Sequence, residues 1–496
     1  MKKRRPYSNK ALSWRMLLPC AVSLLALGVC SKSSPLYPMN DWVDVNCFFT
    51  VGRGIRHGLV PYLDLYEQKG PLVYFLYALA ALISENAFLG VFLIEVTCFA
   101  VFLHYSGKTA EVISGALWAY PVATAAVGLA VPITPAFSHG GSAEELLLPA
   151  LAIGLYVVIR AMADNRKILP REGVLLGVMT AAAFWSKYTF CGLFVGLALG
   201  VMIYYTSRRW NRELLRLIGF FLLGVLIPSA LIVAWFASRG ALHAMWNAYI
   251  VNNLTLYSQN IRSGRYDPPL LNLLNNLPWS VPAAVGLLLA YSRKGHQIDA
   301  ITLSLSATGL FVFTYLNGRR YPYYALILSV FAAPGFGYAF FWISRRTKGH
   351  LKALRRIAAG LTVLIVLVCP FAAYHLSQNT YLLGTAREDM PQYRFAAKMR
   401  QTEEQTLLNV GFLDGGFYYA AGVLPVNPFF CTLNISLPEM DEAIDGVIQN
   451  GEVAYVVTRQ RQLEWADAYR LIDESSFPYE GRSWTYYLYR RNDHLP

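Results

Sequence analysis

The first 374 residues alternate between long apolar segments and short polar loops. A helix needs about 20 apolar residues to cross a bilayer, and on that criterion we interpret about eleven segments as spans. The first follows the basic stretch MKKRRPYSNK, and we expect an uncleaved anchor there rather than a signal peptide. The pattern predicts an all-α polytopic membrane bundle. Its spans are expected over residues 12–30, 87–105, 110–131, 146–162, 173–185, 190–205, 217–236, 279–291, 300–316, 323–342 and 358–374.

Residues 71–84 form an apolar stretch of a different kind, about half as long as a span requires. We expect a helix lying at the membrane interface, where Tyr74 and Tyr77 would suit an aromatic belt. Counting this stretch as a span would invert the orientation of every segment after it.

The basic residues predict the orientation of the bundle. Lys and Arg are enriched in cytoplasmic loops, and residues 2–5 are all basic, which places the N-terminus in the cytoplasm. Every loop that alternation then places inside is basic: residues 166–171, 208–216, 293–294 and 344–356. The C-terminus is therefore expected outside the cytoplasm, in a multi-pass protein of the cell membrane.

Residues 375–496 have a soluble composition, which predicts a second domain after a membrane domain of residues 1–374. Strand-like runs cover residues 406–412, 453–458 and 484–490, and helix-like runs cover 387–401 and 437–449. We expect a small extracytoplasmic α/β domain there.

Composition supports a membrane protein. Of 496 residues, 55% are hydrophobic and 15% are charged, against about 25% charged in soluble domains. The net charge of +13 is explained by the basic loops, and no segment resembles a nucleic-acid-binding module. Among the seven cysteines, only Cys47 and Cys431 lie clearly outside the apolar segments, and a pairing between them stays open.

The loop from Asn40 to Leu72 gathers charge beside the first apolar segment. Asp44 could be a general base or a metal ligand at the membrane edge, or a solvated loop acid or helix cap. Asp41 could simply cap a helix. Lys69 could pair with a phosphate or extend to the membrane surface. Asp64 and Glu67 belong to the same loop.

This loop resembles the first outer loop of the GT-C membrane glycosyltransferases, which include protein O-mannosyltransferase-like and aminoarabinose-transferase-like enzymes. The resemblance rests on Asp44, on the spacing to Gly52 and Gly58, and on the segment PYLDLYEQKGPLVYFLYAL. Within that segment Glu67, Lys69 and residues 70–72 match the family's acid–lysine–glycine–proline–leucine element, with Gln68 inserted. The resemblance implies a polyprenyl-phosphate sugar as donor and a catalytic role for the carboxylate of Asp44.

The resemblance also implies a second acidic site in the next large outer loop, where Glu144 and Glu145 stand near His139. Either glutamate could be catalytic, or both could cap the helix that follows. His139 is interpreted as an ordinary loop histidine. Asp44, Glu67 and Glu145 could hold a divalent cation such as Mg²⁺ or Mn²⁺.

Three cations are expected outside, contrary to the usual bias: Lys187, Arg319 and Arg320. Such cations could bind the donor phosphate and stabilise the leaving group, or lie at the interface. Tyr323 stands where related members often have His, which leaves its role open. Four residues of the long loop could contact donor or acceptor: Arg262, Arg265, Tyr266 and Asp267.

The resemblance thus implies a membrane glycosyltransferase that moves a sugar from a polyprenyl-phosphate donor to an extracytoplasmic hydroxyl of a glycan, lipid or protein, with inversion. The expected partners are the bilayer, the donor and the acceptor, and no nucleic acid. The alternatives are a multi-pass secondary transporter or permease, with polar groups at broken helices in mid-membrane, and a membrane-anchored binding protein.

Overall fold

The computed structural model describes residues 9–256, 268–316, 318, 320–432, 435, 437–462, 464–465, 467–479 and 482–492. The chain divides into two compact units, which we name the helical unit and the mixed unit. The helical unit comprises Met1–Ser31, Leu93–Leu231 and Arg265–Tyr381, and the mixed unit comprises Lys32–Phe92, Ile232–Gly264 and Leu382–Pro496. This division follows contacts, whereas the expected boundary after residue 374 separates membrane from soluble chain, so that boundary stays a prediction.

Seven helical segments in the described part of the chain are long and apolar enough to cross a membrane. They are α4 (Leu89–Ser114), α6 (Ala143–Ala163), η1–α8 (Tyr188–Ser207), α9 (Asn211–Ser238), α14 (Gln297–Tyr315), η4–α15 (Pro322–Arg346) and α16 (Leu351–Leu376). The other four expected spans fall on the helices α1 (Asn9–Cys30), α5 (Ala119–Ala130), α7 (Pro170–Ser186) and α13 (Leu277–Tyr291). The polytopic helical fold is confirmed, and the number of spans stays a prediction.

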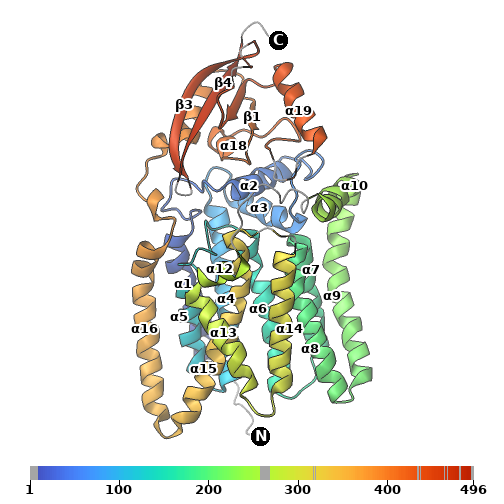
Figure 1. Ribbon diagram of the computed structural model, residues 1–496, viewed down its shortest axis with the longest axis vertical. Coiled ribbons are helices and arrows are strands. Elements are labelled where there is room, and N and C mark those ends of the chain that lie inside the picture. Colours follow the sequence, from blue (N-terminus) through green and yellow to red (C-terminus); the bar gives the residue numbers. More distant parts are fainter. Residues whose placement is uncertain are drawn as a thin grey trace. The chain divides into compact units, whose positions relative to one another are not determined.

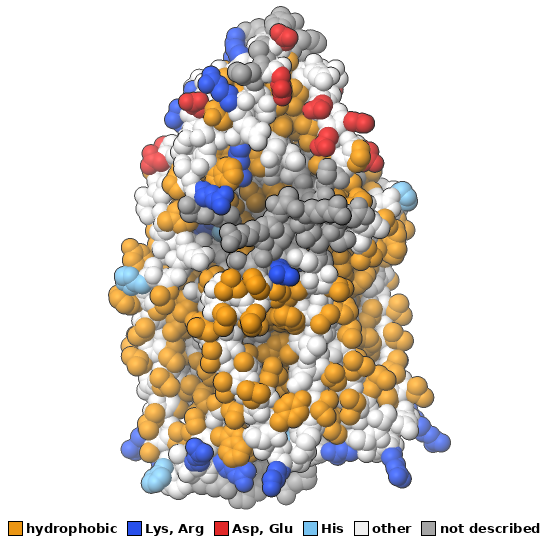
Figure 2. All heavy atoms as spheres, viewed as in Figure 1, with side chains coloured by type: hydrophobic (Ala, Val, Ile, Leu, Met, Phe, Trp, Pro, Cys, Tyr) orange, Lys and Arg blue, Asp and Glu red, His pale blue; other side chains and the backbone are white. Residues whose placement is uncertain are grey.

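The surface of the helical unit is what a bilayer would cover. Hydrophobic side chains cover its long helices in Figure 2, and Lys and Arg side chains gather at one end of them. Helices α9 and α16 are the least buried of the seven, with Leu226 and Leu367 among their exposed side chains. Apolar surface of this extent is normally buried, so the outward face of these helices fits contact with lipid.

Small residues bring α8 (Cys191–Ser207) and α14 together, and the two helices lie side by side in Figure 1. A Cβ atom on Gly196 would overlap the backbone at Ser306, and one on Gly192 would overlap the backbone at Gly309. Such close approach is how membrane helices gain packing contacts without a hydrophobic driving force between them.

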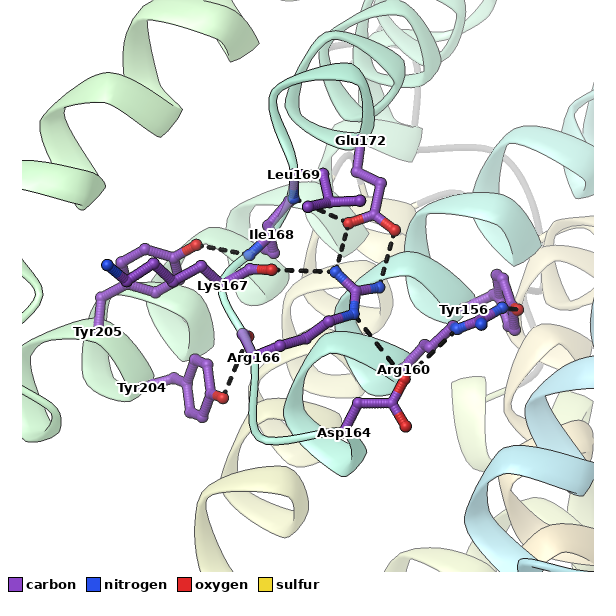
Figure 3. Close-up of polar contacts among 10 residues, drawn as sticks. All are labelled: Tyr156, Arg160, Asp164, Arg166, Lys167, Ile168, Leu169, Glu172, Tyr204 and Tyr205. Carbon is purple, nitrogen blue, oxygen red and sulfur yellow. Dashed lines mark hydrogen bonds and ion pairs between the residues drawn. The ribbon is translucent and has the colours of Figure 1, made fainter. Parts of the chain in front are cut away.

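The turn between α6 and α7 is one of the loops expected inside, and Figure 3 shows its residue Arg166 paired with Glu172. Arg166 donates two hydrogen bonds to Glu172, at 2.7 and 2.8 Å, and Lys167 lies 2.6 Å from Glu213. Glu172 also accepts a hydrogen bond from the backbone of Leu169 at the start of α7. These contacts order the turn.

Helix α3 (Pro71–Ile83) occupies the stretch expected to lie at the interface. The expected aromatic belt is wrong, because Tyr74 and Tyr77 are both fully buried. The reason is the close packing of α3 on α2 (Val43–Arg56): a Cβ atom on Gly52 of α2 would lie 2.6 Å from the backbone of Tyr77.

The C-terminal part of the mixed unit is built on a four-stranded sheet with the order β1-β2-β4-β3. The strands are β1 (Leu407–Val410), β2 (Tyr455–Thr458), β3 (Tyr469–Tyr479) and β4 (Arg482–Arg491), with β1 and β2 parallel and the other pairs antiparallel. Helices α17 (Pro391–Met399), α18 (Phe417–Ala421) and α19 (Pro438–Gln449) accompany it. Strands β1, β2 and β4 were expected, whereas β3, with the sequence YRLIDESSFPY, was missed because its polar residues hide the alternation.

Candidate functional site

Asp44 lies in the first turn of α2, where it is buried. The Nζ atom of Lys69 lies 3.9 Å from the Oδ2 atom of Asp44 and 5.4 Å from the centre of the Phe48 ring. Asp44 and Lys69, both predicted site residues, are therefore neighbours in space although 25 positions separate them in the sequence.

The segment from Tyr62 to Lys69 is held by its own hydrogen bonds. Glu67 accepts from the backbone N–H of Lys69 at 3.0 Å and from the hydroxyl of Tyr74. The hydroxyl of Tyr62 donates to the carbonyl of Lys69 at 2.6 Å. Asn253 donates to the carbonyl of Gln68 at 2.7 Å. Glu67 therefore positions the backbone that presents Lys69, which is a supporting role.

Asp41 and Asp64 have structural partners. Asp41 forms a buried ion pair with Lys32, a residue that sequence analysis did not single out. Asp41 does not cap α2, since the N-cap is Trp42 and its backbone N–H donates to Asn40 instead. Asp64 accepts a hydrogen bond from the backbone N–H of Val60 at 2.7 Å and so closes a turn.

Asp414 is a fully buried acid in the mixed unit that sequence analysis missed. It accepts hydrogen bonds from the hydroxyl of Thr50 at 2.6 Å and from the backbone N–H of Gly416 at 2.8 Å. Burial raises its pKa to about 6 in spite of these hydrogen bonds. Nothing in the local pattern LDGGF predicts burial, because that follows from the packing of α2 on this loop.

Glu144 and Lys187 form the second pair that the structure brings together, in the helical unit. The Nζ atom of Lys187 lies 2.6 Å from Oε1 of Glu144 and 3.6 Å from the centre of the Tyr324 ring. Helix α7 ends at Ser186 and the chain is extended at Lys187, which frees this side chain from the helix surface. A buried carboxylate, a lysine and an aromatic face thus meet where α6 begins and α7 ends.

Glu145 has a different environment from Glu144. Its backbone N–H donates to the N-cap residue Ser142, and its carboxylate accepts from the backbone N–H of Gly141 at 2.8 Å. Glu95 lies close enough to hydrogen-bond Glu145, and Ser31 donates to Glu95 at 3.0 Å. The capping alternative fits Glu145 well, since its side chain satisfies a backbone donor before α6.

Glu95 was missed although the sequence carries a signal for it. It stands in the middle of the apolar run LGVFLIEVTCFAV, and an ionisable residue within a span is a candidate functional residue by default. It is fully buried in α4.

Tyr323 and Arg320 belong to the same chain segment as Tyr324, the residue whose ring contacts Lys187. The Tyr323 ring is in edge contact with Tyr324, at 5.0 Å between centroids, and stacks on Tyr321 at 5.5 Å. The backbone carbonyl of Arg320 accepts a hydrogen bond from Asn272. The remaining expected site residues lie outside the described residues: Arg319, Arg262, Arg265, Tyr266 and Asp267.

The expected cation has no assembled ligand set in the described part of the chain, where no three His, Cys, Asp or Glu residues form a group able to hold a metal. Glu67 and Glu145, two of the three expected ligands, already accept hydrogen bonds from protein donors. The need for Mg²⁺ or Mn²⁺ stays a prediction.

Comparison with solved structures identifies the fold. ArnT from Cupriavidus metallidurans matches in its apo state with a TM-score of 0.63 and 14% sequence identity, over 97% of this chain and 98% of that chain. The same protein bound to undecaprenyl phosphate matches with a TM-score of 0.62, at the same identity and coverage. An oligosaccharyltransferase from Archaeoglobus fulgidus, at 15% identity and a TM-score of 0.46, is too distant to add to the argument.

No family model matches the chain, and no curated protein matches its sequence. The structural match nevertheless extends over nearly the whole of both chains, so it includes the membrane helices and the C-terminal sheet. At 14% identity this match shows that the chain shares the fold of ArnT.

Proposed function

We propose that this protein is a membrane glycosyltransferase of the GT-C type that takes a sugar from a polyprenyl-phosphate donor. The observation that carries the proposal is the pair of carboxylate–lysine contacts, Asp44 with Lys69 and Glu144 with Lys187. Each unites residues that the family resemblance assigns to acid–base chemistry and to phosphate binding. The binding of undecaprenyl phosphate by ArnT, which shares the fold, supports a lipid phosphate as part of the donor.

In this proposal Asp44 is the general base. The acceptor hydroxyl oxygen attacks the anomeric carbon, the bond from that carbon to the phosphate oxygen breaks, and polyprenyl phosphate leaves. The hydroxyl proton passes to the carboxylate of Asp44, which lies in the first turn of α2. A single displacement of this kind inverts the anomeric centre.

The lysines act on the donor phosphate. Lysine–phosphate contacts are charge-assisted and stabilise the charge that develops on the leaving group. Before the donor binds, Glu144 holds Lys187 against the Tyr324 ring, which fixes the position of the ammonium group. Arg319 and Arg320 are assigned the same role from the sequence.

The finer assignments are part of the same proposal. The acceptor is a hydroxyl of an extracytoplasmic glycan, lipid or protein, and the N-terminus is cytoplasmic. A hexosyl or pentosyl group would suit a donor of this class. A divalent cation, if required, would draw on carboxylate oxygens such as those of Asp44.

The proposal is tested by titrating polyprenyl phosphate, without sugar, against the purified protein in lipid nanodiscs. The wild type should bind, and Lys69→Met and Lys187→Met should each weaken binding roughly ten- to a hundredfold, because each removes a charge-assisted contact of about 1.5–3 kcal/mol. The double variant should lose less than the sum of the two if both lysines act on the same phosphate.

Lys167→Met is the matched control, because Lys167 lies in the α6–α7 turn, where it pairs with Glu213 of α9. This substitution should leave the affinity for polyprenyl phosphate unchanged. If all variants bind polyprenyl phosphate with equal affinity, Lys69 and Lys187 do not bind the donor phosphate. If the wild type binds no polyprenyl phosphate, the proposal that this protein is a glycosyltransferase is contradicted. The alternative of a secondary transporter then remains. A screen of several polyprenyl-phosphate sugars, scored for transfer or hydrolysis, then identifies the sugar.

A further inference from the structure

Cys47 and Cys431 are in contact in the mixed unit. Their Sγ atoms lie 3.8 Å apart although the residues are separated by 384 positions in the chain. Each side chain is 1% exposed. The distance exceeds a disulfide bond length of about 2.05 Å by about 1.8 Å. Two thiols in direct contact, from opposite ends of the sequence, are suitably placed for a covalent bond.

The surroundings hold the two thiols in this arrangement. The backbone N–H of Asp414 donates to the Cys47 sulfur at 3.4 Å, and Thr50, one turn further along α2, donates to the Asp414 carboxylate. The backbone N–H of Thr432 donates to the carbonyl of Phe412 at 3.1 Å, which keeps Cys431 beside the same loop. Both cysteines are therefore fixed to the segment from Phe412 to Asp414 by hydrogen bonds.

We propose that Cys47 and Cys431 form an intramolecular disulfide in the mature protein. Two thiols lose two protons and two electrons as the sulfur–sulfur bond forms. A disulfide-exchange protein of the extracytoplasmic compartment accepts both, and its own disulfide becomes two thiols. The reaction takes place while the mixed unit folds, since in the folded protein both sulfurs are out of reach.

The bond has a definite place in the proposed mechanism. Cys47 stands three residues after Asp44 on α2, so the disulfide joins the helix that carries the proposed base to the chain that follows β1. It does not depend on the proposed function, because it requires only an oxidising compartment.

The test is a thiol count on protein trapped in acid directly from cells, denatured without reductant and treated with N-ethylmaleimide. Mass spectrometry should find five adducts on the seven cysteines, and digestion should yield one linked pair of peptides that contains Cys47 and Cys431. Treatment with dithiothreitol before alkylation should give seven adducts.

Cys20→Ser is the matched control, since Cys20 is exposed on α1 and its loss should leave four adducts and the same linked peptides. Cys47→Ser should instead leave all six remaining cysteines reactive. Seven adducts on the unreduced wild type, or a linked pair that involves other cysteines, would overturn the proposal. The thiol count does not require enzyme activity. A negative result would therefore contradict the disulfide and leave the proposed glycosyltransferase function untouched.

Discussion

Glu144 and Glu145 are neighbours in the sequence, but their side chains have different partners. Successive residues of a helix point about 100° apart, so at the start of α6 one carboxylate reaches Lys187 and the other turns back to Gly141. Sequence analysis left the choice between them open. The contacts pair Glu144 with Lys187 and place Glu145 as a cap at the start of α6. Asp44 and Asp64 differ in the same way, since Asp64 closes a turn.

At this scale we predict that Asp44→Asn abolishes turnover while the protein stays folded. The change keeps the shape of the side chain and removes the charge that a general base needs. The loss should be roughly 10²–10⁴-fold and should fall on kcat rather than on donor affinity. Steady-state kinetics in nanodiscs, with donor titration alongside, measure both quantities.

Asp64→Asn is the matched change, because an amide oxygen can still accept the hydrogen bond from Val60. Turnover of that variant should stay within about threefold of the wild type, a difference of roughly 0.6 kcal/mol. Near-normal turnover by Asp44→Asn would mean that Asp44 is an ordinary loop acid.

At the scale of elements, the loop before α6 depends on close packing. Gly140 has a φ of +84°, and a Cβ atom there would overlap the Ser31 hydroxyl and lie 2.8 Å from a Glu95 oxygen. The loop is thus packed onto α1 and α4 through a position where only glycine fits. The pairing of Glu144 with Lys187 depends on this loop, because the loop sets where α6 begins.

We predict that Gly140→Ala lowers the stability of the helical unit and also weakens turnover. The left-handed backbone alone costs an alanine about 1 kcal/mol, and the overlap should add roughly 2 kcal/mol. Gly115→Ala separates the two effects, since Gly115 has a φ of +68° but open space around its Cα. Thermal unfolding in detergent measures both variants, and equal losses would contradict a packing role for Gly140.

At the scale of the whole molecule, two acids of the mixed unit, Asp414 and Asp473, give stability opposite dependences on pH. Burial raises the pKa of Asp414 to about 6, so its charged form is disfavoured in the folded protein. Its stabilising contribution is complete below about pH 4 and is lost as the pH rises through 6. Burial alone would raise the pKa of Asp473 too, but Arg394 and Lys398 outweigh it and lower that pKa.

We therefore predict that Asp414→Asn is more stable than the wild type at pH 7, by at most about 3 kcal/mol, and equally stable near pH 4. The amide keeps an acceptor for Thr50 and carries no charge. Asp473→Asn should behave in the opposite sense, with its loss of stability visible at pH 7 and diminishing as the pH falls through the lowered pKa of Asp473. Unfolding curves at a series of pH values decide this, and an unchanged pH profile in Asp414→Asn would refute the assignment.

The orientation of the molecule in the membrane is a further prediction at this scale. Glu144 lies at the start of α6 and Lys187 directly follows the end of α7. The basic α6–α7 turn, drawn in Figure 3, joins the other ends of the two helices. With that turn in the cytoplasm, alternation places the C-terminus outside. A periplasm-dependent phosphatase fused after Pro496 should be active and a cytoplasm-dependent reporter should be inactive. The reverse result would also move Lys187 to the cytoplasmic side.

The sequence by itself determined the class of fold and the positions of most helices, because length, apolarity and flanking charge act locally along the chain. It also singled out Asp44, Lys69, Glu144 and Lys187 among its candidates, since charge beside apolar segments is conspicuous. Only the tertiary structure decided which of these residues meet. It paired each lysine with one acid, gave Asp41 and Glu145 structural partners, and buried Asp414 and the tyrosines of α3. Partner choice and burial depend on packing between segments far apart in the chain, such as Cys47 and Cys431, and no local pattern carries that information.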